Sequence, residues 1–234
     1  MKMNVYERHA YLYSAWTALF VPCVLSMVVA WDMLPAMLGA MQPLLKIIGV
    51  FVSSAVVYGA VGFFIRELFR NTSKLLFQFP LFKEDETKMP TTEFLMWKNK
   101  YISHSQIEQV HTKLQTQYGY AMYDEQQEET DELEARKNIV GAVGIMREAT
   151  RGDKLLLQCN YRYGYQRNTL GGLVWSFIAV FIFLIANYIW NFPLKVCGWI
   201  ALIIIILQGV IAFLFMKYAS RNYARVLINV FISK

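Results

Sequence analysis

The sequence predicts a mainly α-helical fold: a four-helix transmembrane bundle, made of two hairpins, with a central and mostly helical cytoplasmic insert. Three observations lead to this prediction. Hydrophobic residues make up 56% of the chain and charged residues only 17%, whereas soluble domains have about 25% charged residues. Four long segments contain no charged side chain, and residues 67–167 separate the second of them from the third. The same composition excludes a disordered or collagenous chain, and three cysteines are too few for a disulfide scaffold.

The four uncharged segments are long enough to cross a bilayer as helices. A helix needs roughly 20 apolar residues to cross the hydrocarbon layer, and the segments cover residues 10–31, 47–65, 168–194 and 196–216. A cleaved signal peptide is the alternative for the first segment. Its length, its bulky Trp16, Phe20 and Trp31, and the lack of a clear small-residue cleavage site favour a span.

Lysine and arginine lie mainly on one side of these spans. That side has Lys2, Arg8, Arg66, Arg70, Lys74, Arg162, Arg167, Lys217, Arg221, Arg225 and Lys234, and the other has only Lys46 and Lys195. Because cytoplasmic flanks are enriched in these residues, we expect a multi-pass protein of the cell inner membrane with both termini and the insert in the cytoplasm. The formal net charge of +6 therefore reflects the membrane flanks rather than a nucleic-acid-binding domain.

The spans divide the chain into four parts. These are a first transmembrane hairpin at 1–66, a cytoplasmic gate or sensor insert at 67–167, a second transmembrane hairpin at 168–217 and a cytoplasmic tail at 218–234. The insert is too long to be a simple loop, so we expect it to have a fold of its own.

Several local patterns predict the structure of the insert. The second span should continue as a helix over 66–79, and Pro80 should end it. Ser105 and Glu108 predict a capping box for an amphipathic helix over 105–118. A second helix is expected from 125 to 149, a short strand over 154–163, and a helix cap at Asn168 or Thr169 before the third span.

Candidate metal ligands and reactive residues are few. His104, Glu108 and His111 are spaced to share one face of a helix and could bind a metal, but His111 lies on the apolar stripe, and a packed histidine is the favoured interpretation. Cys23, Cys159 and Cys197 fit packing positions, with a Cys23–Cys197 bridge as the alternative. Since no motif for catalysis or phosphate binding is present, we predict neither an enzyme nor a cofactor.

The stretch 158–168 combines tyrosines with arginines. In an extended chain Tyr161, Tyr163 and Tyr165 would share a face, next to Arg162 and Arg167. Rings beside guanidinium groups suit stacking and phosphate contacts with a nucleotide or single-stranded nucleic acid. We include Arg70 and Lys74 in this candidate ligand site. The simpler alternative is an aromatic and basic belt just below the bilayer.

Small and neutral polar residues interrupt the apolar spans. Ser53, Ser54, Tyr58, Gly59 and Gly62 do so in the second span, and Ala55 with Gly59 forms a pair of small residues that would let two helices approach closely. Helix packing within the subunit is one interpretation, and pore lining in an oligomer is the other. Asn187 and Gln208 in the last two spans allow the same two interpretations.

The layout resembles small membrane effectors of bacterial antiphage defence systems of the CBASS, Hailong and Kiwa types. The stretches concerned are RNTSKLLFQF at 70–79, EARKNIVGAVGIMR at 134–147 and YRYGYQRNTLGG at 161–172. The resemblance implies an oligomeric channel or pore that stays closed until a cytoplasmic cue arrives. In some of these families the cue is a cyclic nucleotide or a DNA oligomer made by a partner nucleotidyltransferase.

The expected function is thus that of a homo-oligomeric ion channel or pore, with a homotetramer as the expected assembly and membrane lipid as its surroundings. Four spans in one subunit can hardly enclose an aqueous path, so conduction requires assembly. The alternative is a non-conducting membrane scaffold that recruits a cytosolic defence partner from the same operon. Residues 91–118 and 125–149 would then form the docking surface for this partner. An enzyme that acts on lipid would need a nucleophile beside Arg66, Arg70, Arg162 and Arg167, and the sequence has none there.

Overall fold

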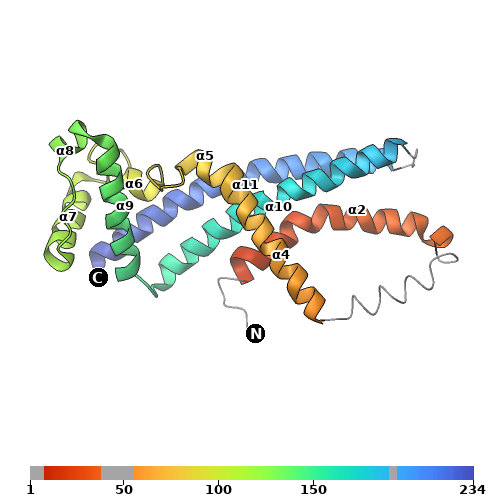
Figure 1. The fold of residues 1–234 in the computed structure, drawn as a ribbon, viewed down its shortest axis with the longest axis horizontal. Helices are drawn as coiled ribbons and strands as arrows, with labels where there is room; N and C mark the ends of the chain where they lie inside the picture. The colour runs from red at the N-terminus through yellow and green to blue at the C-terminus, as the bar shows by residue number, and fades with distance from the viewer. Residues whose placement is uncertain (1–7, 38–54, 190–193) are drawn as a thin grey trace. The chain divides into compact units, whose positions relative to one another are not determined.

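The computed structural model describes residues 8–37, 55–189 and 194–234, and the described chain is helical with no strand (Figure 1). Three helices are long and apolar enough to cross a membrane: Ala10–Val28, Lys154–Ile189 and Lys195–Ser233. Membrane association is therefore supported by structure as well as by composition. The predicted second span lies partly outside the described residues, so the four-span arrangement in two hairpins stays a prediction.

The chain divides into two compact units. Unit 1 comprises Met1–Lys74 and Tyr165–Phe213, and unit 2 comprises Leu75–Gly164 and Leu214–Lys234. The two longest helices, α10 (Lys154–Ile189) and α11 (Lys195–Ser233), each contribute residues to both units without a break in the helix. The tail predicted at 218–234 is thus the last part of α11 and belongs to unit 2 together with most of the insert.

Unit 1 contains the apolar helices. Besides parts of α10 and α11 it has a short π-helix η1 (Arg8–Leu12), α2 (Tyr13–Met37) and α4 (Ala55–Ser73). Next to the chain reversal between α10 and α11, a β-carbon on Gly198 would lie 2.5 Å from Leu184 Cδ2, so the two helices are in close contact there. Most outward-facing side chains of this pair are large and apolar, as a lipid-facing surface requires.

Unit 2 is a helical domain with its own core. It contains η2 (Lys74–Gln78), α5 (Phe79–Phe82), α6 (Pro90–Leu95), α7 (His104–Tyr118), α8 (Glu125–Thr130) and α9 (Glu132–Ala149). Four elements supply most of the core: α6, α7, α9 and the end of α11, with buried side chains that include Phe94, Leu95, Val110, Leu114, Ile139, Val143, Met146, Leu227, Ile228 and Phe231.

Helix caps explain where the helices of unit 2 begin. The capping box of α7 is formed by Ser103 with Gln106, so the predicted pair Ser105 and Glu108 is wrong by two residues. A second box, Asp124 with Gln127, starts α8. Asp131 then accepts a hydrogen bond from the backbone N–H of Glu134 and starts α9. The single helix predicted over 125–149 is therefore two helices, because an aspartate cap interrupts it.

Three further local predictions are wrong. Residues 154–163 are not a strand but the first turns of α10, which Asp153 caps by accepting a hydrogen bond from Leu156 N at 2.9 Å. The predicted caps Asn168 and Thr169 consequently lie in the middle of that helix. Pro80 does not end the helix either. It occupies the first turn of α5, where the backbone N–H that proline lacks has no intrahelical acceptor.

Candidate functional site: a three-helix junction in unit 1

Two adjacent glycines bring α10 into backbone contact with α4 and α2. A β-carbon placed on Gly171 would lie 2.0 Å from the carbonyl oxygen of Phe69, and one on Gly172 would lie 2.5 Å from Ala18 Cβ and 2.8 Å from the ring of Phe69. Atoms cannot approach this closely, so only glycine fits at both positions.

Hydrogen bonds join α10 to the N-terminal helix on either side of the glycines. Asn168 Nδ2 donates to the Ala10 carbonyl at 2.6 Å, and Ser176 Oγ donates to the Ala18 carbonyl at 2.6 Å. Both donors are buried, with 1% and 0% of their surface exposed. Since the higher-numbered residue of one helix pairs with the higher-numbered residue of the other, the two helices run in the same direction through the junction.

The matching surfaces follow a four-residue repeat. On α10 the repeat is Asn168, Gly172 and Ser176, and on η1 and α2 it is Ala10, Ser14 and Ala18, all six of them buried. Residues four apart lie on one face of a helix, and small side chains there allow two membrane helices to approach closely. The sequence patterns described above include such a repeat of small residues only at Ala55 and Gly59. The stripe on α10, which includes a hydrogen-bonding Asn and Ser, could have been found by the same pattern.

The α4 side of the junction has a similar arrangement. Trp175 Nε1 donates to Thr72 Oγ1 at 2.9 Å, and Ser73, which is fully buried, lies next to Gly171. The tripeptide Arg-Asn-Thr occurs once in α4 at 70–72 and once in α10 at 167–169. The junction uses a different residue from each copy, the threonine in α4 and the asparagine in α10.

Basic residues surround this junction within unit 1. The Arg66 guanidinium lies 5.2 Å from the Tyr11 ring centre and 4.8 Å from that of Phe63. Arg70 pairs with Glu67 at 3.5 Å. Arg167 is 9% exposed, and its Nε donates to Asn168 Oδ1 at 3.3 Å. These contacts fit helix ends at a membrane surface, where aromatic rings and cations are enriched.

The residues of the predicted ligand site lie on a helix, which changes their geometry. Side chains two apart on an α-helix point in nearly opposite directions, so Tyr161 and Tyr165 share a face that Tyr163 does not. The expected row of three tyrosines on an extended strand is therefore wrong. Tyr163 is buried, Arg162 is exposed, and Tyr165 shares a 2.8 Å hydrogen bond with Thr17.

The predicted set is also divided between the two units. Tyr161, Arg162 and Tyr163 belong to unit 2, and Tyr165, Arg167, Arg70 and Lys74 belong to unit 1. Whether any of them binds a ligand stays a prediction.

Of the predicted pore or packing residues, those in the last two spans are the most informative. Asn187 is fully buried, and neither atom of its side-chain amide has a hydrogen-bond partner in the part of the chain that the structure describes. The amide oxygen of Gln208 is in the same situation. Unpaired polar groups are costly in an apolar surrounding, so both amides are candidates for contact with a buried water molecule. Gln208, which is only partly buried, is also a candidate for contact with another subunit.

The second-span residues are described only in part. Ser53 and Ser54 lie outside the described residues, and for Tyr58 and Gly59 only the helical backbone is described. Gly62 is exposed, and a β-carbon there would meet no atom within 4 Å. Gly62 therefore makes no close helix contact within the described chain, unlike Gly171 and Gly172.

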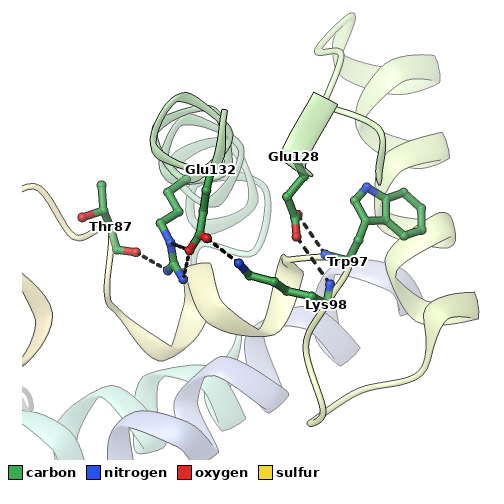
Figure 2. Close-up of polar contacts among 6 residues, drawn as sticks. Thr87, Trp97, Lys98, Glu128 and Glu132 are labelled. Atoms are coloured by element: carbon green, nitrogen blue, oxygen red, sulfur yellow. Dashed lines mark hydrogen bonds and ion pairs between the residues drawn. The ribbon is translucent and has the colours of Figure 1, made fainter. Parts of the chain in front are cut away.

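In unit 2, a buried carboxylate organises the chain between α6 and α7. Glu128 is 5% exposed and accepts hydrogen bonds from the backbone N–H groups of Trp97, at 2.9 Å, and Lys98, at 3.4 Å (Figure 2). The Trp97 ring packs on His111, with ring centres 4.8 Å apart, and His104 lies at 6.2 Å. The two histidines thus contact a tryptophan, and no group of three or more His, Cys, Asp or Glu suited to a metal occurs among the described residues.

The three cysteines are free. Cys23 is exposed, Cys159 is buried and Cys197 is intermediate. Cys159 accepts a hydrogen bond from Asn222 Nδ2 at 3.3 Å, and burial raises the pKa of its thiol. It is therefore a packing residue of unit 2, and the alternative of a Cys23–Cys197 bridge is wrong for this structure.

The hydrogen bond of Asn168 predicts a measurable contribution to stability. Asn168→Leu keeps the branching and the number of side-chain heavy atoms but removes the donor to Ala10, and we expect a loss of about 0.6–1.7 kcal/mol, as found for hydrogen bonds between membrane helices. The measurement is unfolding of the purified protein by dodecyl sulfate in mixed micelles. Asn71→Leu is the matched control, because the asparagine of the other Arg-Asn-Thr tripeptide is exposed. An equal loss in both variants would contradict a specific role for Asn168.

His111 predicts that unit 2 loses stability in mild acid. Burial lowers the pKa of His111 below its usual 6.5, and its Nε2 has no hydrogen-bond partner in the described chain. Between the two pKa values the unfolded chain binds a proton that the folded chain does not, so stability is complete above pH 6.5 and falls as the pH drops below it. Thermal unfolding at pH 5.0 and pH 7.5 tests this. His111→Gln should reduce the difference and His104→Gln, at an exposed site of the same helix, should preserve it.

The junction therefore consists of small, hydroxyl and amide groups whose chemistry is close packing and hydrogen bonding, and it holds three helices of unit 1 in fixed register. Comparisons with protein-family models, with curated proteins and with solved structures find no match to the chain.

Proposed function

We propose that the chain is the subunit of an oligomeric ion channel or pore in the inner membrane, kept closed until a cytoplasmic cue acts on unit 2, and that it serves as an effector of antiphage defence. One observation supports this proposal above the others. The helices α10 and α11 each run without a break from the core of unit 2 into the apolar part of unit 1. Any displacement of unit 2 therefore acts directly on two membrane helices.

The junction determines how the helices of unit 1 would respond to such a displacement. At Gly171 and Gly172, α10 contacts α4 and α2 without any intervening side chain of its own. It therefore cannot slide past α2 without breaking a buried hydrogen bond, or past α4 without breaking the exposed one between Trp175 and Thr72. Packed interfaces of this kind change between discrete arrangements rather than deform gradually. We infer that α2, α4 and α10 move together, which is suitable for a gate with two states.

Assembly would supply the conducting path. One chain has too few spans to enclose water, so we expect a ring, with a homotetramer as the working hypothesis. Neutral polar groups are the ones available to line such a path. Gln208 supports this idea, because its side chain is only partly buried and its amide oxygen is unpaired among the described residues, in an apolar part of the chain. Asn187 is fully buried within its own chain, so the helices would have to move before it could reach such a path.

The geometry also supports the proposed orientation. Since α2 and α10 run parallel at the junction, both would cross the membrane in the same direction. The basic flanks favour the cytoplasm as the side from which these helices enter. The cue would then be a cytoplasmic nucleotide, an oligonucleotide or a partner protein.

Conductance across a planar bilayer is the test of this function. Purified protein, with its oligomeric state measured by light scattering, is studied alone and with a panel of cyclic nucleotides and short DNA oligomers. We expect discrete currents that depend on one of these ligands, and Arg162→Ala should abolish the response while Arg151→Ala, an exposed control in unit 2, should not. Silence of a verified oligomer with every ligand would contradict the channel and favour the non-conducting scaffold.

A further inference from the structure

The segment 83–89 that joins α5 to α6 has a strained backbone. Lys83 has φ 62° and ψ 156°, and Glu86 has φ 61°. Left-handed φ values are unfavourable for residues with a β-carbon, and the combination at Lys83 lies in a region that only glycine occupies readily. We call residues 83–89 the strap. Its conformation must be maintained by contacts that offset this strain.

The contacts that hold the strap come chiefly from α9. Arg147 Nη1 pairs with Glu86 Oε2 at 2.9 Å, and Arg136 Nη1 donates to the Thr87 carbonyl at 2.9 Å. Figure 2 shows Thr87 next to α9, in the same polar network as Glu132 and Lys98. Two arginines eleven residues apart lie about three turns apart on the same face of a helix, so α9 presents both of them to the strap.

The remaining contacts are within the strap and to its neighbours. Asp85 Oδ1 accepts hydrogen bonds from the N–H of Thr87, at 3.2 Å, and from its hydroxyl, at 2.7 Å. Thr92 Oγ1 donates to the Glu86 carbonyl at 2.9 Å. Tyr223 of α11 lies within electrostatic reach of Arg147, so one guanidinium acts on the strap, α9 and α11.

We propose that the strap is a strained latch whose closed state is maintained by the Glu86–Arg147 ion pair. Both side chains are about one-third exposed, at 32% and 35%, so water and salt screen the pair and its contribution is modest. A modest clamp opposed by backbone strain makes a contact that opens easily while the core of unit 2 stays folded. Opening frees α5, which follows α4 and η2 along the chain. The regulatory role of the latch rests on the proposed function, but the opening of the strap can be measured without any measurement of channel activity.

Hydrogen exchange of the full-length protein in micelles is the test. The strap contains amides that report closure, since Lys88 N donates to Phe82 O at 3.2 Å and Met89 N donates to Glu86 O at 3.0 Å. Lys83→Gly relieves strain and leaves the ion pair intact, so exchange in the strap should slow by roughly tenfold. Lys83→Ala keeps the β-carbon and the strain, and is the matched control. Glu86→Gln should accelerate exchange several-fold, whereas Glu84→Gln removes an equal charge nearby and should not.

The outcomes separate the latch from the channel. Equal exchange rates of the strap in Lys83→Gly and Lys83→Ala would overturn the latch. The latch would also be overturned if the exchange rate of the strap changed only together with that of the core peptide 139–146. Where exchange follows the prediction, Glu86→Gln should raise and Lys83→Gly should lower the open fraction in bilayers. Currents unaffected by both variants would overturn the regulatory role. Silence of every variant, the unmodified chain included, would refute the channel and support the latch as a conformational element alone.

Discussion

Gly171→Ala is expected to destabilise unit 1 by about 2–3 kcal/mol, the usual cost of forcing an extra carbon into a packed site. The new β-carbon would lie 2.0 Å from the Phe69 carbonyl oxygen, which is a backbone atom and cannot rotate away. The helices must therefore separate, which weakens the hydrogen bond of Trp175 to Thr72, one turn along the same face. Dodecyl sulfate unfolding in mixed micelles, followed by tryptophan fluorescence, measures the loss.

Gly209→Ala is the matched control for this substitution. Gly209 lies in the apolar part of α11, and a β-carbon there meets no atom within 4 Å. Alanine has a higher helix propensity than glycine by about 0.8–1.0 kcal/mol, so this variant should be unchanged or slightly more stable. A similar loss in both variants would show that any added methyl group in a span is harmful, and would contradict the close contact at Gly171.

Phe231→Ala is expected to destabilise unit 2 by about 3–5 kcal/mol, the usual cost of removing a buried aromatic ring. Phe231 lies close to the C-terminus but is 1% exposed, and it packs in the core with a ring contact to Tyr118 at 6.0 Å. Lys113 Nζ lies 5.3 Å from the centre of the same ring. Loss of unit 2 should appear as rapid hydrogen exchange throughout α7 and α9, measured on the full-length protein.

Phe215→Ala provides the comparison, because it removes the same ring from the same helix. Phe215 is 54% exposed, and exposed positions usually change stability by no more than about 0.5 kcal/mol. Equal stability of the two variants would mean that the last turns of α11 are dispensable for unit 2, contrary to the packing described above.

The membrane character and the helical class followed from the sequence because they depend on uninterrupted stretches of apolar residues, which need no tertiary information. The caps were harder to place. Asp131 and Asp153 are strong cap residues, yet one lies inside a stretch that looked like a continuous helix, and the other precedes KLLLQCNYRY, whose apolar pattern does not distinguish helix from strand. In both cases the aspartate cap fixes where the helix begins.

The junction was visible in the sequence only in fragments. The glycine pair at 171–172 is visible in the sequence, but its partners Phe69 and Ala18 lie in other helices and no local pattern connects them. The stripe of small residues on η1 and α2 could have been recognised from its four-residue spacing. The strap could not, because a left-handed φ at Lys83 and Glu86 is imposed by the surrounding contacts and contradicts the preference of those residues.

The contribution of α11 to the core of unit 2 sets an order for biosynthesis. Ala224, Leu227, Ile228 and Phe231 belong to the same buried cluster as Phe94 and Val143, but the ribosome makes them long after the rest of that cluster. Domains generally fold as units during synthesis, from the N-terminus onward, and unit 2 cannot do so. Its core closes only after the last apolar helix has left the ribosome, so a chain interrupted earlier has its apolar helices without a finished unit 2.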